Sequence, residues 1–356
     1  MKKKVIFMGI MLLVGSIFFA SSPLDRQDLY IKAVSETDPQ MKIQLLKQYE
    51  GLYGQQQDHY IKFIYIQLAE TLFQVKNYHE AITYGEKALE FAEIPATNKL
   101  NLLYALANSY QASQKDLQKA YDYADSMIEL TNWVIDKAKN SDLEKEKIEE
   151  FVKTYKAYYI ASGYRIQAMT LFSRDKENLE TIKESAQKAV AAYMEDKSEN
   201  SSRLLFSLVG QLYKNNKLDD AIAIVGKVFD ETNPNSRFAS FLGASYYKKG
   251  DKDKAVYYFE LAYKTNRDIK TAMNIGRLVH KKDIDKGIQY FADAFILSSL
   301  DENSKAFEYL RDLYYNHKAK NLPSREQDKG FKEIIEAAKV RVGVEVTEDT
   351  AATTTN

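Results

Sequence analysis

The sequence predicts an all-α protein, an α-solenoid built from antiparallel helix pairs. Hydrophobic residues recur at spacings of three and four from about residue 25 to about residue 341, which is the period of one helix face. Only 5 Pro and 14 Gly occur in 356 residues, so few strand-turn signals interrupt that pattern. With 45% hydrophobic and 28% charged residues, the composition is that of a folded chain and not of a disordered one.

The first residues have the features of a secretory signal peptide, predicted over residues 1–22. Three lysines, Lys2 to Lys4, precede an uncharged and mostly apolar stretch from Val5 to Ala20. That stretch is shorter than the roughly 20 residues that span a bilayer comfortably. Cleavage is expected after Ser22, and an uncleaved N-terminal anchor is the alternative. The sequence therefore predicts export from a bacterial cytoplasm, to the periplasm or to the medium, with membrane contact only if the segment stays uncleaved.

The chain contains no cysteine, and its charges balance. Without Cys there is no disulfide framework, no thiolate metal site, no Cys nucleophile and no lipoprotein anchor. There are 50 basic and 50 acidic side chains, so removal of the N-terminal lysines leaves a mildly acidic mature protein. This balance does not favour nucleic-acid binding, and no nucleic-acid partner is expected.

Three glycines mark a fixed repeat in the C-terminal half. Gly210, Gly243 and Gly276 follow one another at intervals of 33 residues, and each interval holds two predicted helices. A period near 34 with two helices per unit resembles the tetratricopeptide repeat (TPR) family. The unit around Gly243 carries the family's small-and-aromatic pattern at Leu242, Gly243, Tyr246, Gly250, Ala255, Phe259 and Ala262. We expect Gly243 and Ala255 to let the two helices approach closely, with aromatic rings filling the space around the contact.

Other units match the TPR pattern less evenly. A second good match in the N-terminal half comprises Leu68, Ala69, Leu72, Tyr78, Ala81, Ala88 and Pro95. The turns that follow Gly210 and Gly276 are one residue shorter than the family's turn. An apolar stripe suited to a terminal capping helix consists of Phe331, Ile334, Ile335 and Ala338. The resemblance implies a right-handed superhelix, and the repeat length implies about eight helix pairs.

The predicted organisation has five segments. They are a signal peptide or anchor (1–22), N-terminal TPR-like helix pairs (23–140), an irregular longer helix pair (141–200), a C-terminal TPR array with its capping helix (201–341) and a disordered tail (342–356).

The sequence contains no motif for catalysis, a metal or a cofactor. The four histidines are scattered, and no metalloprotease, nucleophile-elbow, phosphate-loop or dinucleotide signature occurs. Adjacent carboxylates such as Asp219 and Asp220 point in different directions on a helix. We therefore expect no enzymatic activity, no metal and no cofactor. The irregular segment 142–195 is the one place where a catalytic cleft would be sought.

A basic surface is predicted on the first helices of two repeats. The TPR resemblance implies that the first helix of each pair lines a concave groove, and some members of the family clamp a carboxylate there. The residues at groove positions are Arg237, Ser240, Tyr247, Lys248, Lys270, Met273, Asn274, Arg277 and Lys281. Because Lys270, Asn274 and Arg277 are spaced by four and three, they share one helix face and can donate charge-assisted hydrogen bonds to a carboxylate. The alternative is an ordinary solvated Lys/Arg face.

Two functions are compatible with these features. The first is a non-catalytic periplasmic or secreted scaffold that binds a protein or peptide, acidic in character, through its concave groove. The alternative is a structural or assembly component of the cell envelope that docks by its ends or its convex face. Exposed apolar surface on the terminal helix pairs would favour the second.

Overall fold

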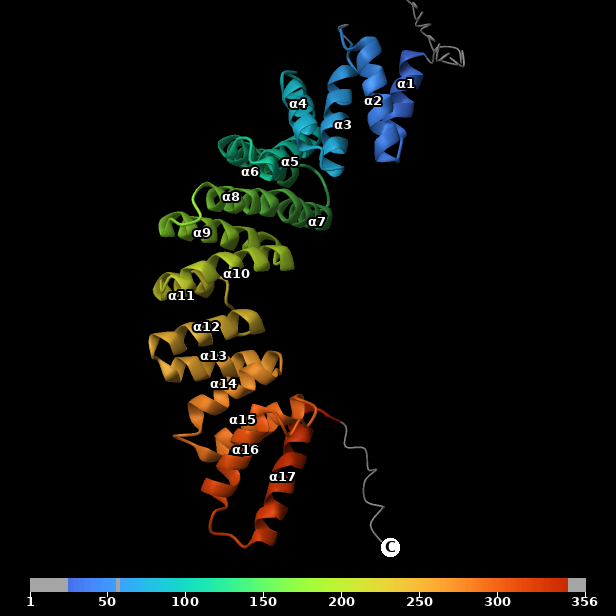
Figure 1. Cartoon of the computed structure of the whole chain (residues 1–356). Helices are drawn as coiled ribbons and strands as arrows, with labels where there is room; N and C mark the ends of the chain where they lie inside the picture. Colours follow the sequence, from blue (N-terminus) through green and yellow to red (C-terminus); the bar gives the residue numbers. More distant parts are fainter. Residues whose placement is uncertain (1–24, 56–57, 345–356) are drawn as a thin grey trace, which may run out of the picture. The chain divides into compact units, whose positions relative to one another are not determined.

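The computed structural model describes residues 25–55 and 58–344, and every regular element in this part of the chain is a helix (Figure 1). Short turns join successive helices that contact each other, as α3 with α4 and α12 with α13. The predicted all-α class is therefore confirmed. The predicted signal peptide or anchor (1–22) and almost all of the predicted tail lie outside the described residues.

The helices are labelled as in Figure 1. In order, they are α1 (Arg26–Ser35), α2 (Pro39–Tyr53), α3 (Ile61–Gln74), α4 (Tyr78–Leu89), α5 (Ala96–Ser113), α6 (Leu117–Lys139), α7 (Lys145–Tyr155), η1 (Lys156–Ile160), α8 (Ala161–Arg174), α9 (Leu179–Asp196), α10 (Glu199–Lys214), α11 (Leu218–Gly226), α12 (Ser236–Lys249), α13 (Lys252–Thr265), α14 (Ile269–Val279), α15 (Ile284–Leu297), α16 (Lys305–Asp312), η2 (Leu313–Lys318) and α17 (Ser324–Val342).

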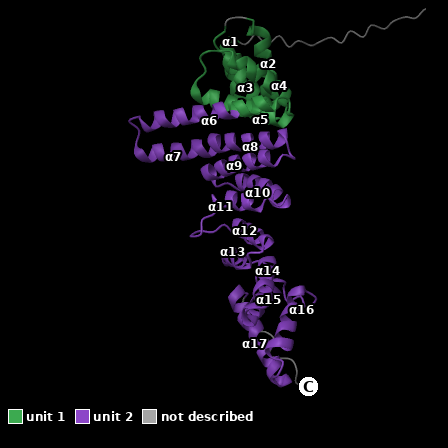
Figure 2. Cartoon of the chain, turned by 90° about the vertical axis from the view of Figure 1, so that its left-hand side faces the viewer, with its two compact units in different colours: residues 1–123 green, residues 124–356 purple. Residues whose placement is uncertain are grey.

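The chain divides into two compact units, residues 1–123 and 124–356, which Figure 2 colours separately. The boundary falls within α6. In the first unit, one buried cluster surrounds Tyr49 and another surrounds Leu106. In the second unit, the largest cluster runs from α13 to α17 and includes the fully buried ring of Phe291.

Side chains at the helix ends explain where the helices of the second unit begin and stop. Asn235, Asp251, Asp268 and Asp283 each precede a helix, and a side-chain oxygen of each accepts a hydrogen bond from a backbone N–H of the first turn. Gly250 ends α12 with φ at 89°, a left-handed conformation that glycine adopts without strain. The four capping residues therefore define where α12, α13, α14 and α15 begin, and Gly250 defines where α12 ends.

Two of the repeat glycines allow a close approach of the paired helices. A Cβ atom at Gly243 would lie 2.7 Å from the ring of Phe259 on the partner helix. A Cβ atom at Gly276 would lie 2.8 Å from the ring of Phe291. Real Cβ atoms do not come so near to ring carbons, so only glycine permits this spacing. The close approach expected at Gly243 is confirmed.

The third repeat glycine makes no such contact. In the part of the chain that the structure describes, no heavy atom beyond the helix's own backbone and the adjacent residues lies within 4 Å of the place that a Cβ atom of Gly210 would occupy. Val225 follows Gly210 at the interval at which Phe291 follows Gly276. Valine is too small to reach the backbone of the facing helix as the phenylalanine ring does. A residue with a Cβ atom would therefore fit at position 210. The glycine spacing thus repeats, but its packing role does not.

A buried carboxyl group in the first unit, that of Glu70, makes the free energy of unfolding depend on pH. On α3, Oε1 of Glu70 is buried and has no hydrogen-bond partner among the described residues, while Oε2 accepts a hydrogen bond from Gln67 Nε2 at 3.3 Å. Burial raises the pKa of Glu70 to about 7, because the charge of Lys42 and a hydrogen bond from Asn101 offset only part of the desolvation. The folded protein therefore holds a proton on Glu70 at pH values where the unfolded chain has lost it.

We expect Glu70→Gln to stabilise the protein in mildly alkaline solution. Because the folded pKa of about 7 lies above the unfolded value of 4.5, the unfolding free energy of the wild type should fall as pH rises between these values. The glutamine variant should lack the part of that fall that Glu70 causes, and well above the folded pKa it should be more stable by about 3 kcal/mol, since the pKa rise from 4.5 to about 7 corresponds to about 1.4 kcal/mol for each pH unit. Urea denaturation across this pH range measures the difference, with the exposed Glu93→Gln as control. Parallel curves for wild type and the Glu70 variant contradict the prediction.

The segment predicted to be an irregular longer helix pair (141–200) contains one long continuous helix. It consists of α7, η1 and α8, and η1 is a π-helical turn between the two α-helical parts. Within it, Tyr159 is buried and Tyr158 is half exposed. α9 then packs along α8.

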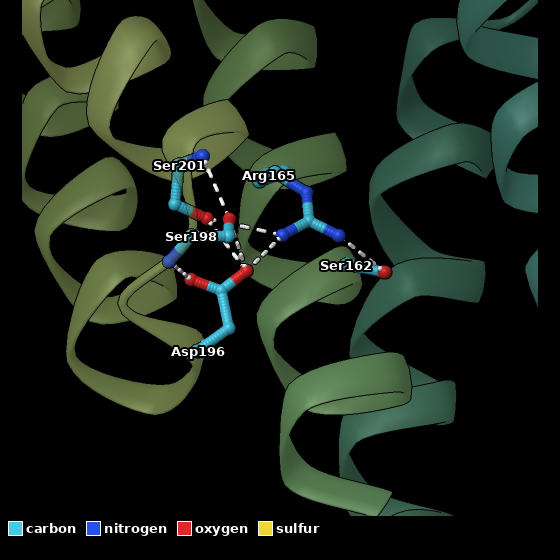
Figure 3. A network of polar contacts seen from close by, with 5 residues as sticks. All are labelled: Ser162, Arg165, Asp196, Ser198 and Ser201. Carbon is cyan, nitrogen blue, oxygen red and sulfur yellow. Dashed lines mark hydrogen bonds and ion pairs between the residues drawn. The ribbon is translucent and has the colours of Figure 1, made fainter. Parts of the chain in front are cut away.

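A polar network ties α8, α9 and α10 together in this region (Figure 3). Arg165 forms an ion pair with Asp196 and donates a hydrogen bond to Ser162 Oγ at 2.7 Å. Asp196 Oδ2 also accepts hydrogen bonds from Ser198 Oγ at 2.7 Å and Ser201 Oγ at 3.0 Å. The Asp196 side chain is only 6% exposed, and the guanidinium balances its charge. The network thus joins three successive helices through one buried carboxylate.

Candidate functional site

The residues of the predicted basic surface come from the helices α12 and α14. On α14, Ala272, Ile275 and Gly276 are buried in the core that the helix shares with α15. The other side of α14 carries Lys270 and Arg277, both exposed. Since side chains three and four residues apart are neighbours on a helix, the apolar stripe that faces the core leaves these basic residues on the open face.

Four of the predicted residues lie together along this open face, which we call the α14 face. It consists of Lys270, Asn274, Arg277 and Lys281. Asn274 is partly buried, and Lys281 lies in the turn that follows the helix. Within the described part of the chain, Lys270, Asn274 and Lys281 form no ion pair or side-chain hydrogen bond, so their donors remain available to a partner.

An aromatic stack holds the guanidinium of Arg277. Its central carbon lies 5.2 Å from the ring centroid of Tyr309 on α16, a cation–π distance. The ring of Tyr309 stacks in turn on the buried ring of Phe291, with centroids 5.0 Å apart and planes inclined by 13°. This contact uses the charge of the guanidinium and none of its N–H groups, which can therefore bind a carboxylate in bidentate fashion. Tyr309 therefore orients Arg277 before any partner arrives.

On α12, the predicted residues are already engaged with α10. Arg237 donates a hydrogen bond to Glu199 at 2.8 Å, and Glu199 also accepts one from Arg203. These two hydrogen bonds, that of Arg237 first, hold the pKa of Glu199 below its usual value. Lys248 donates to the backbone carbonyl of Tyr213 at 2.9 Å. Glu199 thus neutralises the charge of Arg237. The basic surface with free donors is therefore confined to α14 and the turn after it, and does not include Arg237 of α12 as the sequence predicts.

The remaining predicted residues differ in exposure. Tyr247 is 56% exposed at the end of α12, whereas Ser240 is partly buried. Met273 is buried in the core of the second unit, so its predicted place in a groove is wrong. Its side chain packs in the core beside Ala272, because the apolar face of α14 includes position 273 as well as the positions that the sequence assigned to the core.

Sequence reasoning missed two residues that shape this surface. Tyr309 supports Arg277, and Glu199 neutralises Arg237. Each lies roughly one repeat length from the residue it contacts, 38 positions apart in the case of Arg237 and Glu199. A search for opposite charges and for rings at that offset, on the first helices of neighbouring pairs, would have found both.

The described residues contain no group of three His, Asp or Glu side chains placed to hold a metal ion. In the same part of the chain, no helix has both the length and the apolar character needed to cross a bilayer.

The packing between α12 and α13 decides the type of repeat. Gly243 on α12 meets Phe259 on α13, and Ala255 is fully buried beside them, as the TPR pattern implies. The packing of this helix pair is the packing that the TPR resemblance predicts. No protein-family model matches the chain, and no curated protein matches it.

Three solved structures are similar to this chain in fold. A thermophilic TPR protein from Thermus thermophilus is 14% identical with a TM-score of 0.25, and the match covers 71% of this chain and 98% of that one. The C-terminal part of a TPR repeat-containing protein from Cytophaga hutchinsonii is 15% identical with a TM-score of 0.40, covering 79% and 100%. The APC/C hetero-tetramer Cut9–Hcn1 is 14% identical with a TM-score of 0.29, covering 82% and 57%.

Proposed function

We propose that this chain is a non-catalytic scaffold, exported from a bacterial cytoplasm, that binds an acidic protein segment through the α14 face. The observation that carries the proposal is the guanidinium of Arg277, which makes a cation–π contact with Tyr309 and forms no hydrogen bond or ion pair with another side chain among the described residues. Lys270 and Lys281 extend the positive charge along the same helix and its following turn. An acidic segment lying along α14 would meet this charge over three turns.

Arg277→Glu tests the proposal by capture in intact bacteria that produce the chain. A crosslinker that cannot pass the cytoplasmic membrane restricts the reaction to exported protein. We expect the wild type to capture a partner and the variant to lose most of it, since reversing a preoriented charge typically weakens such contacts about tenfold or more. Arg277 is exposed, so the exchange should leave the thermal midpoint nearly unchanged.

Arg325→Glu is the matched control, because Arg325 is exposed near the start of α17 and undergoes the same charge change. Equal capture by wild type and the Arg277 variant would remove the α14 face from the proposal. Failure of all variants to react with the impermeant crosslinker would contradict export.

A second candidate function is a structural or assembly role in the cell envelope. It is favoured by apolar side chains exposed on the terminal helices: Ile31 and Leu52 are 51% and 55% exposed in the first unit, and Val340 is 73% exposed on α17. Exposed apolar residues at the ends of a repeat array are where another chain would dock. A partner that is captured equally by wild type and Arg277→Glu would support this role.

A further inference from the structure

A helical hairpin of the second unit projects without a third layer to cover it. In Figure 2, α6 and α7 extend side by side beyond the end of α9. Their contact is made by Ile128 and Ile135 of α6 with Phe151 and Val152 of α7. α7 itself has no fully buried residue, although Ile148 adds a third apolar side chain to it. The hairpin therefore has apolar surface left over after its two helices have packed.

This apolar surface lines a hollow of about 810 Å³ between the α6–α7 loop, α7 and the last turn of α9. Its apolar lining consists of Leu143, Ile148, Val152 and Met194. Leu143 is 57% exposed and Met194 is 51% exposed, unusual values for large apolar side chains that lie together. Ile148 and Val152 are one helical turn apart, so the floor of the hollow runs along the axis of α7.

The rim of the hollow is basic. Four lysines border it, and two of them are matched: Lys156 by Glu195 at 3.1 Å and Lys145 by Glu149 at 3.7 Å. Lys139 and Lys153 have no ion-pair partner among the described residues. The hollow thus offers an apolar floor with two uncompensated positive charges at its rim, which complement a helix with one apolar and one acidic face.

We propose that this hollow docks an amphipathic helix of a partner protein whose polar face is acidic. Apolar side chains at i, i+3 and i+7 of such a helix would lie along Ile148 and Val152 and cover Leu143 and Met194. Its carboxylates would pair with Lys139 and Lys153 at the rim. This docking surface shares no residue with the α14 face, so the two can be tested separately.

The test uses a fluorescein-labelled helical peptide of leucine and glutamate, with leucines at i, i+3 and i+7, and the full chain. Fluorescence anisotropy should show saturable binding that weakens with added salt. Lys153→Glu and Leu143→Asp should each weaken it about tenfold. Both side chains are exposed, so neither exchange should unfold the hairpin. Lys320→Glu, an exposed charge reversal next to η2, and a twin peptide with lysine in place of glutamate are the controls.

Several results would overturn the proposal. Binding that is absent, or equal in wild type and both variants, removes the hollow as a docking site. Loss of binding in Arg277→Glu alone assigns the peptide to the α14 face instead. Self-association that Leu143→Asp abolishes in sedimentation assigns the hollow to a second copy of the chain. Binding of anionic phosphatidylglycerol vesicles that Lys153→Glu abolishes, with no peptide binding, assigns it to a lipid surface.

Discussion

Gly243→Ala is expected to destabilise the second unit by about 1–3 kcal/mol, although alanine is the better helix former. The new methyl group would lie 2.7–2.9 Å from three ring carbons of Phe259. Phe259 is only 4% exposed and packs within the largest core cluster, so its ring cannot swing away without displacing neighbours. Urea denaturation followed by circular dichroism measures the loss, and amide hydrogen exchange should place it in α12 and α13.

Gly210→Ala is the matched control, and its effect should have the opposite sign. The position is equivalent by repeat, but its added methyl group meets no heavy atom within 4 Å. Only the gain in helix propensity remains, which stabilises by about 0.5–1 kcal/mol. Equal effects of the two substitutions would mean that the repeat position, and not the contact with Phe259, sets the requirement for glycine.

This pair of glycines shows which part of the fold the sequence predicts. Helix period, capping residues and the left-handed turn at Gly250 are local signals, so they predict where α12 and α13 begin and end. Whether a glycine is needed depends on the residue opposite, which lies on another helix. The ring of Phe259 creates that need at Gly243, and Val225 does not create it at Gly210.

For the candidate site too, the sequence predicts what depends on one helix and misses what depends on contacts between helices. The spacing of Lys270, Asn274 and Arg277 predicts a shared helix face, and the structure places them on it. The neutralisation of Arg237 by Glu199 depends on how α12 lies against α10, which no spacing within α12 reveals. The hollow beside α7 also depends on contacts between helices, since it is formed by α7, the α6–α7 loop and the last turn of α9. The spacing of residues within one helix does not predict it.

A buried ion pair fastens the last helix of the second unit to α15. Asp293 is 2% exposed, and its Oδ1 accepts hydrogen bonds from Arg341 of α17 at 2.7 and 3.0 Å. Oδ2 accepts a further hydrogen bond from Tyr263 at 3.1 Å. Burial raises the pKa of Asp293, and Arg341 opposes this rise by its hydrogen bonds and its charge. Without this guanidinium, the buried carboxylate would keep only the hydrogen bond from Tyr263 and the charge of Arg267.

Arg341→Met should therefore destabilise the docking of α17 by about 3 kcal/mol near neutral pH. Arg341 lowers the pKa of Asp293, and this effect is lost in the variant. In the variant, the folded pKa moves further above the unfolded value of 3.8, so the folded state loses stability as pH rises through this interval. The deficit of the variant should be small in acid, where Asp293 is neutral in both states, and largest above neutrality. Urea denaturation and hydrogen exchange in α17 across the pH range measure it.

Adding Asp293→Asn to the Arg341→Met variant separates the buried charge from lost packing. Asparagine keeps the size of the side chain and the hydrogen bond with Tyr263 but carries no charge to desolvate. If the charge of Asp293 causes the loss, the double variant should be more stable than Arg341→Met above neutral pH by about 1–2 kcal/mol, and the part of the pH dependence that Asp293 contributes should disappear. If the double variant is no more stable than the single one, the contribution of Arg341 lies in its aliphatic contacts along α15, and the ion pair is incidental to the attachment of α17.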